Sequence, residues 1–327
     1  MGLTPDQLHT IRVIMRAICP FSILANASVL LVVFIRRHQT SLMNRLQAYL
    51  SFTDIIVSID WMLGTSILPI VPFCTAVGLW HEYFAVSGTC YVFCISLLCY
   101  LTVTQGSKAA EALKWWYFGY ALGLPALFTI ALVVSATGLH RGNMIGDATF
   151  ECWISSAYPE LKVYLLYPLL WIHMAAIAFM YTRIYFLTRV ATSELHEVSK
   201  SSQDPSQVTT HQNDSIRGSA IFSSPAPIFG QPVSIGPRLS QAVNSDKMLL
   251  PHEPHVKVHE SKTNAERKMK KSTHRLILKA SLIAVGFIIS WTPATITRIM
   301  QLLNMPVPFW LLVCTGVCFA LTGLIRC

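Results

Sequence analysis

Few side chains in this chain combine a reactive type with a position inside a long apolar segment. His81 and Glu82 are adjacent, Asp54 and Asp60 lie in an earlier apolar segment, and His173 lies far downstream. A membrane-embedded hydrolase needs clustered His, Asp and Glu at helical spacing, and the sequence does not place His173, His81 and Glu82 together. A metal site is not expected at His173, which has no second ligand nearby in the sequence. The sequence therefore predicts no enzyme activity, no metal site and no cofactor.

The two aspartates still need an explanation, because a carboxylate inside a membrane is costly and is expected to face the bundle interior and find a partner. Asn26, in the first apolar segment, is the candidate partner for Asp54. Asp60 is expected either to contact a polar ligand or to line a wet outer cavity without a specific role.

A second set of residues could act mechanically. The segment Leu276–Met300 carries Phe287, Trp291 and Pro293 in the order F-x-x-S-W-x-P. Proline removes one backbone donor and clashes with the preceding turn, so the helix is expected to bend there. The two rings lie close to this bend and could shift the helix when their packing changes. The alternative is an ordinary kinked membrane helix.

The elements that must position these residues are long and apolar. The chain has 327 residues, of which 53% are hydrophobic and 13% charged. A bilayer requires backbone groups to be satisfied within each segment, so each span is expected to be a helix, and the alternation of a barrel strand is absent. This predicts an all-α membrane protein with seven spans: Ala17–Ile35, Leu46–Ile70, Cys74–Thr104, Trp115–Thr137, Val163–Tyr181, Ala280–Thr297 and Pro306–Ile325.

The third span has two possible starts. If it begins at Phe84, His81 and Glu82 lie in an outer loop. If it begins at Cys74, the helix is about 46 Å long at the standard rise and both residues lie about two turns inside it. The second interpretation is favoured because it leaves a short turn before Cys74, and it makes Glu82 the best single candidate for contacting a polar ligand.

The distribution of Lys and Arg predicts an N-terminus outside and a C-terminus inside. The net charge of +9 follows from this bias, and no soluble basic face for nucleic acid is visible. The basic residues of the later inner loops decide the orientation, among them Lys108, Lys114, Arg267, Lys268, Lys270, Lys271 and Arg275.

Four regions follow from this topology: an external tail over 1–16, five helices over 17–187, a polar inner loop over 188–273 and the last two helices over 274–327. The inner loop is rich in Ser, Pro, Gln and Asn and is expected to be largely disordered. Its basic end, Glu266–Arg275, could extend the sixth helix into the cytosol and meet a partner there, or only touch anionic lipid. Candidates for such a partner contact are Lys270, Lys271, Arg275 and Lys279.

Two of the nine cysteines differ from the rest. Cys74 lies at the outer start of the third span and Cys152 in the loop after the fourth, both on the oxidising side, where a disulfide can persist.

In order and spacing these features resemble a G-protein-coupled receptor, specifically the cAMP-receptor-like group of slime moulds and fungi. The resemblance covers about 250 of the 327 positions. The long polar third inner loop of this chain also resembles that of the fungal members. It rests on the asparagine of helix one, S-F-T-D-I-I in helix two, the cysteine before helix three, C-W-I in the second outer loop, the helix-five proline and the aromatic–proline set of helix six. In this sequence these are Asn26, Asp54, Cys74, Cys152-Trp153-Ile154, Pro168 and Phe287, Trp291 and Pro293.

The resemblance implies a Cys74–Cys152 disulfide and a pocket open to the outside, with Trp291 at its floor. It makes His81, Glu82, Trp153 and Asp60 the candidates for the pocket of an unidentified small extracellular ligand. It further implies a multi-pass protein of the plasma membrane whose helix six swings outward to admit a Gα subunit.

The chain departs from the family in two places. Thr104–Lys108 stands where many receptors carry an acidic–Arg pair, and Cys327 ends the chain before the Asn and Tyr of helix seven. A truncated receptor isoform that does not couple is therefore one alternative, and a polytopic transporter is another. A transporter predicts paired repeats, which the sequence lacks. A microbial rhodopsin needs a lysine in Pro306–Ile325, which has none.

Overall fold

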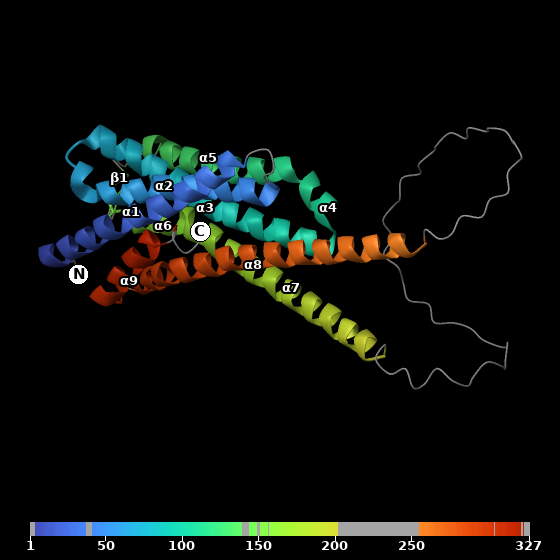
Figure 1. Cartoon of the computed structure of the whole chain (residues 1–327). Coiled ribbons are helices and arrows are strands. Elements are labelled where there is room, and N and C mark those ends of the chain that lie inside the picture. Colours follow the sequence, from blue (N-terminus) through green and yellow to red (C-terminus); the bar gives the residue numbers. More distant parts are fainter. Residues whose placement is uncertain are drawn as a thin grey trace, which may run out of the picture. The chain divides into compact units, whose positions relative to one another are not determined.

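The structure is a computed structural model (Figure 1) that describes residues 4–36, 41–138, 144–148, 151–155, 157–201, 255–303, 305–321 and 323. The chain divides into two compact units. One comprises Met1–Arg189 with Arg267–Cys327, and the other comprises Val190–Glu266. All the sites discussed below lie in the first unit.

The described residues are mostly helical. In chain order the helices are α1 (Pro5–Ile35), α2 (Leu42–Leu63), α3 (Val71–Thr104), α4 (Ser107–Ala112), α5 (Lys114–Gly138), α6 (Pro159–Leu165), α7 (Tyr167–Ser201), α8 (His255–Leu302) and α9 (Phe309–Ala320). A 3₁₀ turn, η2 (Gly64–Ile67), follows α2, and a two-stranded antiparallel sheet of β1 (Ile145–Asp147) and β2 (Cys152–Ile154) precedes α6. The all-α prediction is confirmed apart from this small hairpin.

Among the residues that the structure describes, five helices are long and apolar enough to cross a membrane: Pro5–Ile35, Val71–Thr104, Lys114–Thr137, Val163–Arg189 and Thr273–Leu302. These contain five of the predicted spans, and the protein is a membrane protein by this criterion. The two other predicted spans form α2 and α9. Helix α9 has 12 residues, and at about 1.5 Å per residue it is shorter than a bilayer core of about 30 Å. The sevenfold count and the orientation remain predictions.

Two predicted helix ends shift for local reasons. The second span was expected to reach Ile70, but α2 ends at Leu63 because Gly64 takes φ 52°, a conformation that favours glycine. Helix α3 begins at Val71 with Pro72 in its first turn, where the missing amide donor costs nothing. This start lies three residues before the favoured Cys74 and far from the alternative at Phe84.

The boundaries predicted for the inner loop fall inside helices. Helix α7 continues past residue 188 to Ser201, and α8 begins at His255, well before residue 273. The expectation that Glu266–Arg275 is helical and continuous with the sixth span is therefore confirmed. Residues 202–254 lie outside the described residues, so disorder there stays a prediction.

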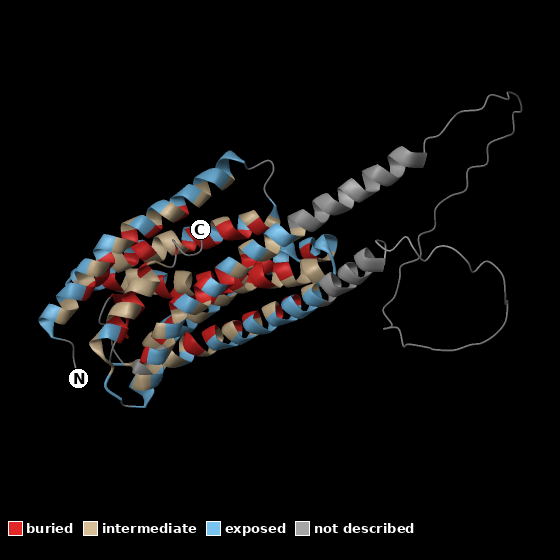
Figure 2. Cartoon of the chain, turned by 60° about the horizontal axis from the view of Figure 1, so that its bottom comes forward, coloured by how far each residue is buried: buried red, intermediate tan, exposed pale blue. Residues whose placement is uncertain are grey.

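The core of the first unit is built around α3, which packs against α2 on one side and α5 on another. Buried positions gather where the helices face each other (Figure 2), and α3 alone buries sixteen residues. A separate apolar cluster joins α1 to α9, with Ile11, Met15 and Cys19 against Leu312 and Ala320. The bundle thus has an interior into which polar side chains can point.

Candidate functional site

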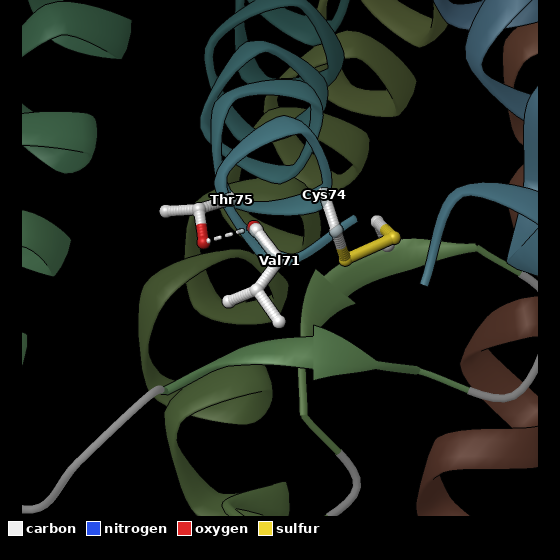
Figure 3. The surroundings of a disulfide bond; sticks show 4 residues. Val71, Cys74 and Thr75 are labelled. Atoms are coloured by element: carbon white, nitrogen blue, oxygen red, sulfur yellow. Dashed lines mark hydrogen bonds between the residues drawn. A yellow bond between two sulfur atoms is a disulfide. The ribbon is translucent and has the colours of Figure 1, made fainter. Parts of the chain in front are cut away.

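A disulfide between Cys74 and Cys152 fixes β2 to the first turns of α3, with the two Cα atoms 5.4 Å apart. Figure 3 shows the bond running from α3 to the strand, beside the first turn of the helix, where the Thr75 hydroxyl donates to the Val71 carbonyl at 2.9 Å. The structure thus contains the bond that the family resemblance implies.

Strand β2 packs along one face of α3. Cys74, Gly78, His81 and Glu82 are spaced i, i+4, i+7 and i+8, which places them on the same side of a helix. A Cβ atom at Gly78 would overlap the Ile145 side chain and would lie 3.1 Å from the Cys152 carbonyl oxygen. Glycine therefore allows the hairpin to lie close against the helix, so that the neighbours of Cys152 reach the next turn of α3.

We expect Gly78→Val to destabilise the protein by about 1–3 kcal/mol, because the added atoms meet backbone and the strand must move away. Gly119→Val in α5 is the matched control, since a Cβ there meets nothing within 4 Å. Thermal unfolding of both purified variants in detergent tests this. Equal melting temperatures for the two variants would mean that the hairpin does not lie on α3.

One turn beyond Gly78, three ionisable side chains from separate elements meet. The Nδ1 atom of His81 lies 2.5 Å from Asp60 Oδ2 and 3.1 Å from Glu151 Oε2. Asp60 comes from the last turn of α2 and Glu151 directly precedes Cys152 of the disulfide. The second carboxylate oxygen of Asp60 is buried and has no hydrogen-bond partner among the described residues.

Glu82 forms the neighbouring contact. It is fully buried, and its Oε2 accepts a hydrogen bond of 2.7 Å from the indole Nε1 of Trp153. The Trp153 ring also lies against His81, with the ring centroids 5.4 Å apart. Three carboxylates thus surround one imidazole in a largely buried site, an arrangement that favours binding of a cationic group.

A cavity of about 610 Å³ opens beside this cluster. Its volume is in the usual range for small-molecule sites, and its lining is apolar with a few polar groups. The wall is shared by α1, α2, α3, the β2 hairpin, α7, α8 and α9. The wall includes Asp54, His81, Glu151, Trp153, Trp291 and Arg298.

The aromatic residues of α8 meet this cavity through Trp291. Its ring packs edge-on against Phe319 of α9 at 4.9 Å, and Phe319 stacks on Trp61 of α2 at 4.8 Å. Phe287 is fully buried one turn below, 6.3 Å from Trp291, and Pro293 lies inside the helix just above. A molecule in the cavity therefore contacts an aromatic chain that links α8 to α9 and α2.

A cation also reaches the cavity. Arg298, one turn of α8 beyond Pro293, donates from Nε to the Tyr167 hydroxyl at 3.1 Å and from Nη1 to Gln301 Oε1 at 2.6 Å. The cavity therefore offers an acidic side near His81 and a basic side at Arg298. Arg298 was not among the residues predicted for the pocket.

Contacts at the opposite end of the bundle join α8 to α2. The Lys279 ammonium group donates to Asn44 Oδ1 at 3.1 Å, across 235 residues of sequence. Asn44 lies in the first turn of α2, where its backbone amide is capped by the Ser41 hydroxyl. Arg275 is exposed one turn of α8 earlier, whereas the side chains of Lys270 and Lys271 lie outside the described residues.

The predicted polar pair, Asn26 and Asp54, comes from α1 and α2, which pack against each other. Asn26 is buried and donates to the Ser22 carbonyl at 3.0 Å, and Asp54 faces the cavity. The Ser58 hydroxyl bridges the two helices, 2.7 Å from the Asp54 carbonyl and 3.4 Å from the Ser22 hydroxyl. A direct Asn26–Asp54 contact stays a prediction.

The four predicted pocket residues divide into two pairs. His81 and Trp153 line the cavity, whereas Glu82 and Asp60 lie behind them. The Trp153 indole, held next to α3 by the disulfide, donates a hydrogen bond to Glu82. Contact of Glu82 or Asp60 with a ligand stays a prediction. Glu151 belongs to the cluster and was not predicted, although its position next to Cys152 was a usable signal.

The sequence matches no protein-family profile and no curated protein sequence. The proposals below therefore rest on the residues of this chain and on the family resemblance described above.

Proposed function

We propose that this protein is a seven-helix receptor of the plasma membrane, of the cAMP-receptor-like type, that binds a small extracellular ligand and activates a heterotrimeric G protein. The observation that carries the proposal is the position of Trp291. Its indole lines the cavity, contacts Phe319, and lies two residues before Pro293 in α8.

The mechanism follows from the contacts of α8. A ligand that changes the packing of Trp291 acts on a helix whose backbone is weakened at Pro293, because proline cannot donate to the carbonyl four residues before it. The far part of α8 carries Lys279 and the basic segment that contains Lys270, Lys271 and Arg275. Movement of that part opens the cytosolic side to a Gα subunit, while the basic residues also contact anionic membrane lipid.

The ligand acts by shifting the equilibrium between a closed and an open state of the protein. It must bind the open state better than the closed state, and a hundredfold preference supplies about 2.7 kcal/mol. The cavity suits ligands that carry both a cationic group and an anionic or polar group. The acidic cluster near His81 can bind the first and Arg298 the second, since both line the same cavity.

The test uses the full chain in nanodiscs with a purified heterotrimeric G protein and a panel of sugars, nucleotides, amino acids and lipids. At least one compound is expected to accelerate GTP exchange, and Trp291→Ala to weaken this response at least about tenfold, equivalent to about 1.4 kcal/mol of coupling.

Trp310→Ala is the matched control, because this indole of α9 is 68% exposed on the surface of the bundle. An unaltered response in Trp291→Ala would reject the switch. If no member of the panel raised exchange above that of empty nanodiscs, the receptor proposal would lose its support, and transport of the same compounds into proteoliposomes would be measured next.

A further inference from the structure

The cluster of Asp60, His81 and Glu151 has the composition of a metal site. One imidazole nitrogen and two carboxylate oxygens, from α2, α3 and the segment before β2, all lie within 4.8 Å of one another. The three side chains are nearly inaccessible to solvent, with exposed fractions of 5% for Asp60, 5% for His81 and 8% for Glu151. We propose that these three residues bind a divalent cation of the zinc type.

Buried carboxylate oxygens without partners are a second observation that points to a bound cation. The Asp60 Oδ1 atom is buried and has no hydrogen-bond partner among the residues that the structure describes, and the same holds for Glu82 Oε1. Buried carboxylate oxygens normally accept hydrogen bonds or ligate metals, because leaving them without a partner costs desolvation energy. A divalent ion beside His81 compensates the excess of negative charge.

The geometry needs only small side-chain movements. Zinc bonds imidazole nitrogen at about 2.0–2.1 Å and carboxylate oxygen at about 2.0–2.2 Å, which places tetrahedral ligands about 3.4 Å apart. The observed separations from His81 Nδ1 are 2.5 Å to Asp60 and 3.1 Å to Glu151. Binding of the ion would move the two carboxylate oxygens slightly away from His81 Nδ1.

The identity of the ion follows from the donors. Magnesium and calcium prefer sites made only of oxygen, whereas a mixed imidazole and carboxylate site suits zinc and its first-row neighbours. Three protein ligands leave one tetrahedral position free. Since His81 and Glu151 line the cavity, that position faces it, and a donor atom of a cavity ligand can complete the coordination.

The elements that carry the ligands are held in place without the ion. The Cys74–Cys152 disulfide fixes Glu151 through its neighbour, and the His81 ring lies between Trp61 at 6.3 Å and Trp153 at 5.4 Å. Such support from surrounding residues is typical of metal sites and sets the orientation of the imidazole. The ion in turn ties the hairpin to α2 and α3.

The experiment uses the full chain, purified in detergent with a chelator and then dialysed against zinc. We expect one zinc ion per chain by elemental analysis, with only nitrogen and oxygen neighbours by X-ray absorption. The cysteines outside the disulfide are the competing ligands, six of them within the part of the chain that the structure describes, and sulfur is recognised by its longer zinc distance of about 2.3 Å.

His81→Gln and Glu151→Gln are each expected to lower the zinc affinity at least tenfold. His173→Gln is the matched control: His173 is equally buried, but its Nε2 contacts the Tyr120 hydroxyl at 2.7 Å in a different part of the bundle. Mass spectrometry of the Cys74–Cys152 cross-link shows whether each variant keeps the hairpin in place.

The proposal is overturned if the parent protein binds no zinc, if zinc has sulfur neighbours only, or if His81→Gln binds zinc as the parent does. None of these results depends on G-protein coupling, so the metal site and the receptor function can fail separately.

Discussion

Cys74→Ser is expected to lower the stability of the protein by about 2–4 kcal/mol, the typical contribution of a native disulfide. The bond closes a loop of 78 residues, which in a freely unfolding chain corresponds to about 4.5 kcal/mol of loop entropy. Helices inserted in a membrane stay partly constrained after unfolding. We therefore expect the loss of stability to be below the loop-entropy value and within the typical range. Thermal unfolding of the purified protein, with and without reductant, measures the effect.

The consequence extends beyond stability, because the bond holds Glu151 and Trp153 against α3. Cys74→Ser should therefore weaken zinc binding and raise the accessibility of the Trp153 indole to a water-soluble quencher. Cys314→Ala is the control, since Cys314 is half-buried and forms no disulfide. If Cys74→Ser melted at the temperature of the parent, the hairpin would have to be held by its other contacts alone.

The parts of this fold that follow from composition were predictable. Long apolar runs must be helical in a bilayer, and the predicted Trp115–Thr137 differs from α5 by one residue at each end. The ends that shifted depend on single backbone conformations, such as the positive φ of Gly64. Continuation of α7 to Ser201 is a further case, because a polar sequence carries no hydropathy signal for where a helix stops.

Site residues were predictable only where the local sequence around a single residue indicated its role. Trp291 precedes a proline inside an apolar helix, and Cys74 and Cys152 were the two cysteines expected on the oxidising side. Asp60 and His81 were predicted for the pocket and Glu151 adjoins Cys152, but the sequence did not indicate that these three residues meet. They lie up to 91 positions apart and come together through the packing of α2 and the hairpin on α3.

The surroundings of Glu82 could not be predicted from the sequence either. A carboxylate two turns inside a helix is a sound ligand candidate from sequence alone. Whether it faces the cavity depends on what covers it, and here the Trp153 indole is its hydrogen-bond donor. This contact comes from strand β2, 71 residues away, and the sequence around Glu82 does not indicate it.

Lys279→Met is expected to raise ligand-independent GTP exchange about tenfold. The Lys279–Asn44 hydrogen bond joins α8 to the first turn of α2, and outward movement of this part of α8 must break it. A hydrogen bond to a charged group contributes about 1.5–3 kcal/mol. Its loss from the closed state alone, even by about 1.4 kcal/mol, increases the open population tenfold.

The partner variant makes this test specific to the contact. Asn44→Ala should raise basal exchange to a similar degree, and the double variant should add little to either single change, because all three remove the same hydrogen bond. Arg275→Ala removes a nearby exposed cation of α8 without touching Asn44. The Arg275→Ala variant is expected to leave the closed state intact and to reduce GTP exchange, because it weakens the contact with the G protein. Additive effects of Lys279→Met and Asn44→Ala, or an equal rise in Arg275→Ala, would show that surface charge rather than this bond holds α8 closed.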